Sequence, residues 1–135
     1  MKLNELCKEI YNENLEKGFN VAEDNIGQVL MLIVSELSEA LEADRKDKNA
    51  NLNAFFESYH FELSKAQKNE GNVDEALIFK TLFEKYIKDT FQDEIADSII
   101  RLFDFCGALI IDIETHIALK RKYNGLRPYK HDKKY

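Results

Sequence analysis

The sequence predicts an all-α protein, an antiparallel bundle of about five to six helices. Only one proline and five glycines occur among the 135 residues, and the many tight turns of an all-β protein need more of these residues than that. Apolar residues make up 44% of the chain and charged residues 33%, so the chain can fill a core and is not disordered by composition. Because this length is typical of one domain, we expect residues 1–135 to form a single unit.

Apolar residues at helical spacing, and the residues that begin or end helices, predict the elements in order. Gly18 ends the first helix, Asp24 or Asn25 can cap the second, and Asp74 caps the fourth. The turn at residues 69–72 is the clearest in the chain and separates the third helix from the fourth. The expected helices cover about 3–17, 26–47, 52–68, 74–88, 90–112 and 114–124.

The second expected helix begins with the most apolar run of the chain, residues 29–34. A helix that is apolar on every face must contact several partners. We therefore expect it to pack both within its own bundle and against a second subunit. A chain of this size buries only about two thirds of its unfolded surface, which also favours a homodimer or homotetramer.

The net charge of −6 is unevenly distributed. Residues 119–135 contain seven basic residues and one acidic residue, a net charge of +6, so the rest of the chain carries −12. An acidic body argues against nucleic acid as the main partner. Acidic helices with a basic tail would hold a cation and an anion together, although a basic tail that is merely solvated has the same composition.

Cys7 and Cys106 each lie among apolar residues at helical spacing. We expect both to be buried free thiols, which suit a reducing compartment. No apolar run reaches the length of a membrane span, and the N-terminus lacks the apolar segment of a signal peptide. The sequence therefore predicts a cytoplasmic protein with no membrane partner.

Two pairs of carboxylates lie beside the apolar stripes of the second and fifth expected helices. Glu36 and Glu39 form one pair, and Glu94 and Asp97 the other. Residues three apart are neighbours on a helix surface, so four carboxylates meet if these helices pack side by side, and they repel unless a cation neutralises them. Carboxylate oxygens suit Mg²⁺ or Mn²⁺. As an alternative, both pairs are solvated, with Asp97 paired to Arg101 four residues later.

The order of these motifs resembles that of a known family. The first motif is Glu36-Leu37-Ser38-Glu39, the second is Glu94-Ile95-Ala96-Asp97, and a basic and amide segment follows at residues 120–131. This pattern is similar to that of the MazG-like all-α nucleoside triphosphate pyrophosphohydrolases. The resemblance implies a MazG-like fold and Mg²⁺-dependent cleavage of a nucleoside or deoxynucleoside triphosphate to the monophosphate and pyrophosphate by an activated water.

The resemblance also implies roles for individual residues. Glu36, Glu39, Glu94 and Asp97 would be the catalytic metal ligands. Lys120, Asn124 and Arg127, which share one helix face, would contact the phosphates or the sugar, unless that face is simply solvated. Base recognition would fall to Gln28, Phe19 and Asn20, although Phe19 is also expected as an ordinary core residue.

Two departures from the family pattern affect these expectations. The family often has a doubled acid at the first motif, whereas this chain has Ser35, so the identity of the general base stays open. The stretch 47–91 separates the two acidic motifs and is longer than a compact family core requires. We expect it to be a helical hairpin insert that reshapes the pocket or the dimer.

Two other classes of protein are alternatives to the hydrolase. A ferritin-like di-iron protein needs two Glu-x-x-His motifs, and this chain has one, Glu57-Ser58-Tyr59-His60. A non-enzymatic helical interaction or assembly module, in which the acids are merely solvated, stays open. Such a module would show no metal-dependent release of pyrophosphate.

Overall fold

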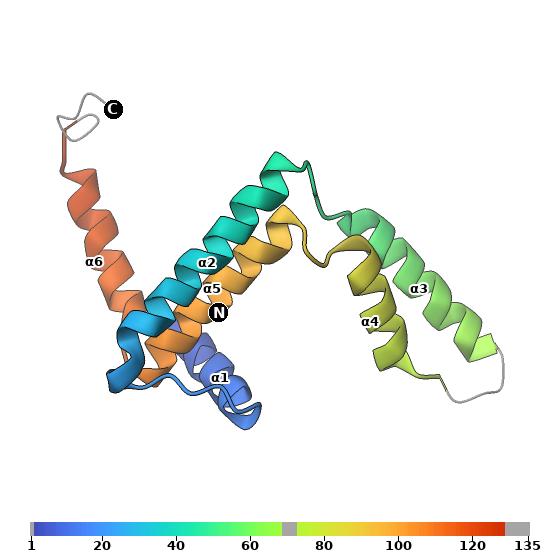
Figure 1. Ribbon diagram of the computed structural model, residues 1–135, viewed down its shortest axis with the longest axis horizontal. Coiled ribbons are helices and arrows are strands. Elements are labelled where there is room, and N and C mark those ends of the chain that lie inside the picture. Colours follow the sequence, from blue (N-terminus) through green and yellow to red (C-terminus); the bar gives the residue numbers. More distant parts are fainter. Residues whose placement is uncertain (1, 69–72, 129–135) are drawn as a thin grey trace. The chain divides into compact units, whose positions relative to one another are not determined.

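The computed structural model describes residues 2–68 and 73–128. These residues form six α-helices and one 3₁₀ turn and contain no strand (Figure 1), so the all-α fold class is confirmed for them. None of their helices is both long enough and apolar enough to cross a membrane. The expected turn at 69–72 lies outside the described residues. The elements are α1 (Leu3–Glu16), η1 (Glu23–Asn25), α2 (Ile26–Arg45), α3 (Leu52–Lys68), α4 (Glu75–Tyr86), α5 (Phe91–Ala108) and α6 (Ile113–Gly125).

Contacts along the chain group the residues into two compact units. The first unit consists of residues 1–30 and 100–135, and the second consists of residues 31–99. The first therefore contains α1, η1, α6 and one end each of α2 and α5. The second contains α3, α4 and the remaining parts of α2 and α5. That residues 1–135 form a single domain stays a prediction.

Side-chain caps fix the starts of two helices. The Asp74 carboxylate accepts a hydrogen bond from the Leu77 amide at 3.0 Å, which confirms the predicted cap of α4. The Asp112 carboxylate accepts one from the Thr115 amide at 3.2 Å at the start of α6. Before α2, the Asn25 side chain accepts a hydrogen bond from the Ala22 amide at 2.8 Å and so closes the 3₁₀ turn that leads into the helix.

Helix α5 ends at Ala108, four residues before the expected end. Ile110 adopts the left-handed conformation, with φ of 54°, and the Ile111 amide donates a hydrogen bond back to the Cys106 carbonyl at 2.9 Å. A left-handed residue just past the last turn is a common way for a helix to end. The chain then turns directly into α6.

In the first unit, α1 packs closely on the C-terminal end of α5. Cys7 and Cys106 are both buried and free, as predicted. A Cβ atom placed on Gly107 would clash with the Cys7 carbonyl and lie 2.8 Å from the Cβ of Tyr11. Glycine is required here because only its lack of a side chain lets the two backbones approach so closely.

In the second unit, α3 and α4 pack against each other through aromatic side chains. Phe55 is buried and stacks on Tyr59, with ring centroids 5.7 Å apart. Phe79 of α4 meets Phe55 edge-on, also at 5.7 Å. The stretch expected to contain a helical hairpin therefore folds as two packed helices.

The ends of this hairpin are joined by hydrogen bonds, which form what we call the neck (residues 48–51 and 86–92). The Phe91 amide donates to the Lys48 carbonyl at 2.9 Å, and the Asn51 amide donates to the Tyr86 carbonyl at 3.0 Å. The Gln92 side chain accepts from the Ala50 amide at 2.9 Å. The neck holds the end of α2 beside the start of α5, where the predicted acidic pairs are located.

Candidate metal centre

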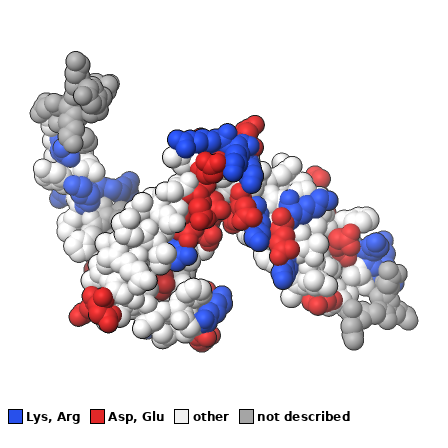
Figure 2. All heavy atoms as spheres, viewed as in Figure 1, with Lys and Arg blue, Asp and Glu red and all other residues white. Residues whose placement is uncertain are grey.

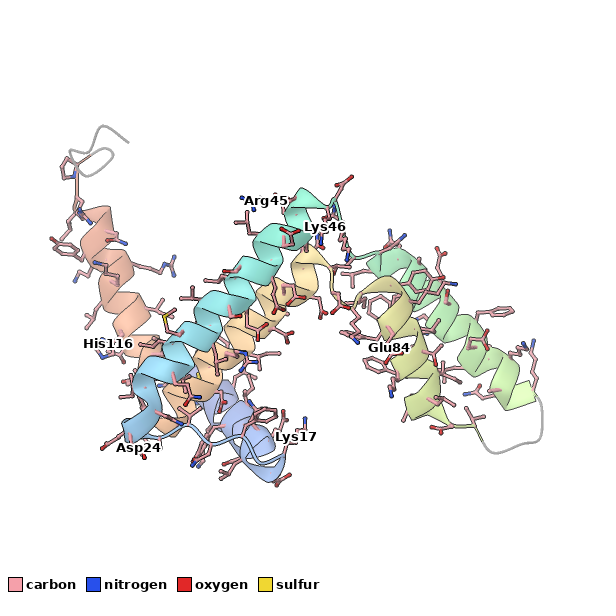
Figure 3. The ribbon with its side chains drawn as sticks, in the orientation of Figure 1. Lys17, Asp24, Arg45, Lys46, Glu84 and His116 are labelled. Atoms are coloured by element: carbon pink, nitrogen blue, oxygen red, sulfur yellow. The ribbon has the colours of Figure 1, made fainter. Side chains whose placement is uncertain are left out.

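Three of the four predicted carboxylates come together in the second unit. Glu36 and Glu39 from α2 and Glu94 from α5 each offer one oxygen, and these atoms all lie within 4.8 Å of one another. The three-residue spacing on α2 puts its two acids on neighbouring positions of the helix surface. Figure 2 shows acidic side chains gathered over this part of α2 and α5, with basic ones beside them. Figure 3 labels two of those basic residues, Arg45 and Lys46, at the end of α2.

Glu94 is the buried member of this group, with 7% of its surface exposed. Burial is the largest cause that raises the pKa of its carboxyl from 4.5 to about 7, and the charges of the neighbouring Glu39 and Asp97 contribute to the same shift. No side chain among the described residues donates a hydrogen bond to this carboxylate. A buried carboxylate surrounded by other acids is unfavourable in its charged form unless a cation or a proton neutralises it.

Asp97, the fourth predicted ligand, lies one turn after Glu94 and is exposed. It is not among the three residues whose oxygens lie within 4.8 Å of one another. Its charge still acts on Glu94, because it is one of the neighbours that raise the Glu94 pKa. The structure thus brings three predicted ligands into one group and places the fourth beside it.

The oxygens of this group suit a small hard cation. Mg²⁺ binds oxygen at 2.0–2.1 Å in an octahedron, so opposite ligand atoms lie about 4.2 Å apart. Adjacent ligand atoms in the same octahedron lie about 2.9 Å apart. The three carboxylate oxygens lie within 4.8 Å of one another, so small movements of these side chains would bring them around one ion. Oxygen-only ligand sets of this kind favour Mg²⁺ or Mn²⁺ over the softer transition metals.

A second acidic group shares Glu94 and was not predicted. It consists of Asp89, Asp93 and Glu94, again with one oxygen each within 4.8 Å of the others. Asp93 accepts a hydrogen bond from the Asp89 amide at 2.9 Å, which fixes one side of the group. The available signal was the run of acids at 89, 93 and 94 around the start of α5.

A pocket of about 350 Å³ in the second unit joins α4 to the start of α5. The α4 side supplies aromatic, basic and acidic groups, including Glu84, which Figure 3 labels. The α5 side supplies Asp93, which belongs to the second acidic group, and Asp97, which belongs to the predicted motif. Sequence reasoning missed this pocket. The lining residues are Phe79, Lys80, Phe83, Glu84, Lys88, Asp89, Asp93 and Asp97.

Of the residues predicted to contact the phosphates, Lys120 and Asn124 lie on α6 and Arg127 follows its end, all in the first unit. The Lys120 ammonium lies 5.2 Å from the centroid of the Tyr123 ring, and the Arg127 guanidinium lies 5.9 Å from it. Both cations therefore lie close to the Tyr123 ring. Asn124 lies on the same helix. That these residues contact substrate stays a prediction.

The residues predicted to recognise the base also belong to the first unit. Gln28 is exposed in the first turn of α2. The Asn20 carbonyl accepts a hydrogen bond from the Asn25 side chain at 2.8 Å. Phe19 is 58% exposed, so its expected place in the core is wrong; the loop after Gly18, which has φ of 88°, carries it to the surface.

Two other features of the chain differ from these acidic groups. His60 of the single Glu-x-x-His motif stacks on Phe56, with ring centroids 6.3 Å apart, and both acidic groups found in the described residues consist of carboxylates alone. In the first unit, Asp104 is a buried carboxylate that sequence reasoning missed. Burial raises its pKa, while a hydrogen bond with Asn14 and the charge of Arg101 lower it.

Comparison of the chain with protein-family models, with curated proteins and with solved structures gives no match.

Proposed function

We propose that this chain is a Mg²⁺-dependent nucleoside triphosphate pyrophosphohydrolase of the MazG-like type, for which Mn²⁺ can replace Mg²⁺. One observation carries the proposal: Glu36, Glu39 and Glu94, from two helices far apart in the sequence, direct three carboxylate oxygens to within 4.8 Å of one another. These are three of the four residues in the motifs that resemble the family. The reaction would convert a nucleoside triphosphate to its monophosphate and pyrophosphate.

The residues of α2 and α5 would divide the work of holding the cation and substrate. Glu36, Glu39, Glu94 and Asp97 would bind the cation, with Glu94 on the buried side and Glu39 and Asp97 towards solvent. A bound Mg²⁺ would neutralise charge on the phosphate oxygens and lower the pKa of a coordinated water towards neutrality. Because the pKa of Glu94 is about 7, binding the cation near neutral pH would displace a proton from this carboxyl.

The family often has an acid where this chain has Ser35. The second acidic group offers another carboxylate that can accept a proton. Asp93 precedes Glu94 directly, lines the pocket with Asp97 and is held by the Asp89 amide. A carboxylate held in this way, beside the bound cation, would accept the proton of the attacking water. That Lys120, Asn124 and Arg127 contact the phosphates, and Gln28 the base, stays a prediction from the resemblance.

The test is a panel of canonical and modified nucleoside triphosphates, with Mg²⁺ or Mn²⁺, in which pyrophosphate release is measured. We expect release that chelation abolishes and that Glu39→Gln reduces by about 100-fold. Glu42→Gln is the matched control, because Glu42 lies on the same helix and pairs with Lys46 at 3.1 Å. Activity that survives both chelation and Glu39→Gln would end the proposal, and the assembly module would then be favoured.

We also propose that the protein is a homodimer or a higher homo-oligomer built on α2. Leu30, Val34, Leu37 and Leu41 are spaced at i, i+4, i+7 and i+11 and form one stripe. Each is between 43 and 50% exposed. A stripe of this kind next to the buried stripe of Val29, Ile33 and Ala40 is typical of a helix that packs on two sides, and a second copy of α2 has the matching shape.

The oligomeric state tests this part directly. Leu37→Lys puts a charge in the stripe, so we expect a smaller molar mass by light scattering after gel filtration than for the wild type. Leu52→Lys is the control, because Leu52 is 56% exposed on α3, outside the stripe. A wild-type chain that elutes as a monomer at all concentrations would contradict the proposal.

A further inference from the structure

The pocket between α4 and the start of α5 combines two kinds of surface. Phe79 and Phe83 form an aromatic wall, with ring centroids 5.9 Å apart and planes 24° from parallel. Phe79 is 47% exposed although it is a large apolar side chain. Asp93 and Asp97 of α5 line the same pocket. The aromatic wall therefore shares one pocket with two carboxylates that lie close to Glu94 in the sequence.

This arrangement suits a ligand with a flat apolar part, whose anionic phosphates would be held by the bound cation because four of the lining residues are acidic and two are basic. Nucleobases stack on aromatic side chains because every base has a π face, and this stacking depends little on which base it is. Lys80 and Lys88 also line the pocket, and their ammonium groups can donate hydrogen bonds to the sugar or to a phosphate oxygen. The volume of about 350 Å³ lies within the range of small-molecule sites, roughly 300–1,000 Å³.

We propose that this pocket receives the nucleobase of the substrate, stacked on the Phe79–Phe83 wall. The inference rests on the proposed function, because Asp97 belongs both to the pocket and to the cation ligands. A triphosphate held by the cation would then extend its nucleoside past Asp97 towards α4. This assigns base binding to α4 in the second unit, in place of the predicted contact of Gln28.

The test compares a nucleoside triphosphate with methyl triphosphate, which has the same phosphates and no base. Phe79→Leu keeps an apolar side chain and removes the flat ring, so we expect kcat/KM for the nucleoside triphosphate to fall about tenfold or more. We expect kcat/KM for methyl triphosphate to stay unchanged. Phe79→Trp should retain activity on both compounds, and Phe61→Leu, at an exposed position of α3 outside the pocket, should change neither.

Equal activity of Phe79→Leu and the wild type on the nucleoside triphosphate would overturn the inference. An equal loss on both compounds would also overturn it, because the ring would then support the fold or the cation site. If the wild type releases no pyrophosphate, the proposed function fails, and nucleoside binding decides the inference separately. In that case the ring resonances of Phe79 and Phe83 are followed by NMR as a nucleoside is added: shifts support the pocket, and unchanged signals overturn it.

Discussion

The two ends of α5 each carry a buried carboxylate, in opposite surroundings. Glu94 near the start is 7% exposed and is surrounded by other acids, whereas Asp104 near the end is also 7% exposed but lies with Asn14 and Arg101. Burial is the largest cause of a raised pKa at both. The two carboxylates differ in their neighbours. Those of Asp104 favour its charged form, whereas those of Glu94 oppose the charged form. The comparison indicates that a carboxylate made unfavourable by its own neighbours is the better candidate for a ligand.

The largest expected effect is at the closely packed end. Gly107→Val places side-chain atoms against the Cys7 carbonyl and Tyr11, so we expect α1 to be displaced and the free energy of unfolding to fall by about 3 kcal/mol. Urea unfolding followed by circular dichroism measures this. Gly27→Ala is the matched control, since nothing lies within 4 Å of a Cβ there, and it should be neutral or stabilising by up to about 1 kcal/mol. Equal stability of Gly107→Val and wild type would contradict the packing described.

At the acidic end, the expected effect is on activity. Glu94→Gln removes a charged ligand, so we expect pyrophosphate release to fall by about 100-fold. In buffer without divalent cations the same change removes a repelled charge, so the melting temperature should stay the same or rise. A Glu94→Gln variant that is less stable than the wild type and fully active would contradict this prediction, because Glu94 would then support the fold and not the reaction.

The free energy of unfolding should also depend on pH through the Glu94 carboxyl. Since the folded pKa of Glu94 is about 7 and its ordinary value is 4.5, the folded state keeps a proton between these values that the unfolded state has lost. This contribution to stability is therefore fully present below pH 4.5 and is lost as the pH rises through about 7. We expect the free energy of unfolding, measured with chelator, to fall between about pH 5 and pH 8.

Two comparisons isolate Glu94 in that experiment. Saturating Mg²⁺ should stabilise the protein more at about pH 8 than at about pH 5, because the cation replaces the proton. Glu94→Gln should lose that part of the slope, while the raised pKa of Asp104 leaves a trend of the same sign. If the slopes of wild type and Glu94→Gln coincide, the raised pKa does not belong to Glu94.

The smallest expected effect is that of Asp104→Asn. One oxygen of Asp104, Oδ1, has no hydrogen-bond partner among the described residues, and an asparagine keeps an acceptor for Asn14 without the buried charge. We expect stability to change by no more than about 1 kcal/mol and pyrophosphate release to be unaffected. A large loss of activity would show that the C-terminal end of α5 also takes part in the reaction.

Local patterns predicted most of the helices and the main acidic group. The three-residue spacing of Glu36 and Glu39 places neighbours on a helix surface wherever that helix lies, and Asp74 could be recognised as a cap from its position alone. The end of α5 was placed too late because Ile110 has a positive φ. This β-branched residue gives no signal of a left-handed turn, which glycine or asparagine usually marks.

The remaining parts of the site depend on contacts between distant segments. The pocket joins Phe79 and Lys80 of α4 to Asp97 of α5, and no periodic pattern within either helix indicates that these side chains face each other. The burial of Glu94 was missed for a similar reason. Helical spacing placed it on the flank of the apolar stripe, whereas packing in the second unit leaves only 7% of it exposed.

The neck has a consequence for how this chain can be rebuilt. Lys48 and Phe91 are joined by a backbone hydrogen bond of 2.9 Å, so 42 intervening residues, 49–90, begin and end at adjacent points. A short glycine-containing bridge between Lys48 and Phe91 would close this gap with little loop entropy. We therefore expect a shortened chain to keep Glu36, Glu39 and Glu94 while losing the aromatic wall, and we expect the same two residues to accept other inserted segments.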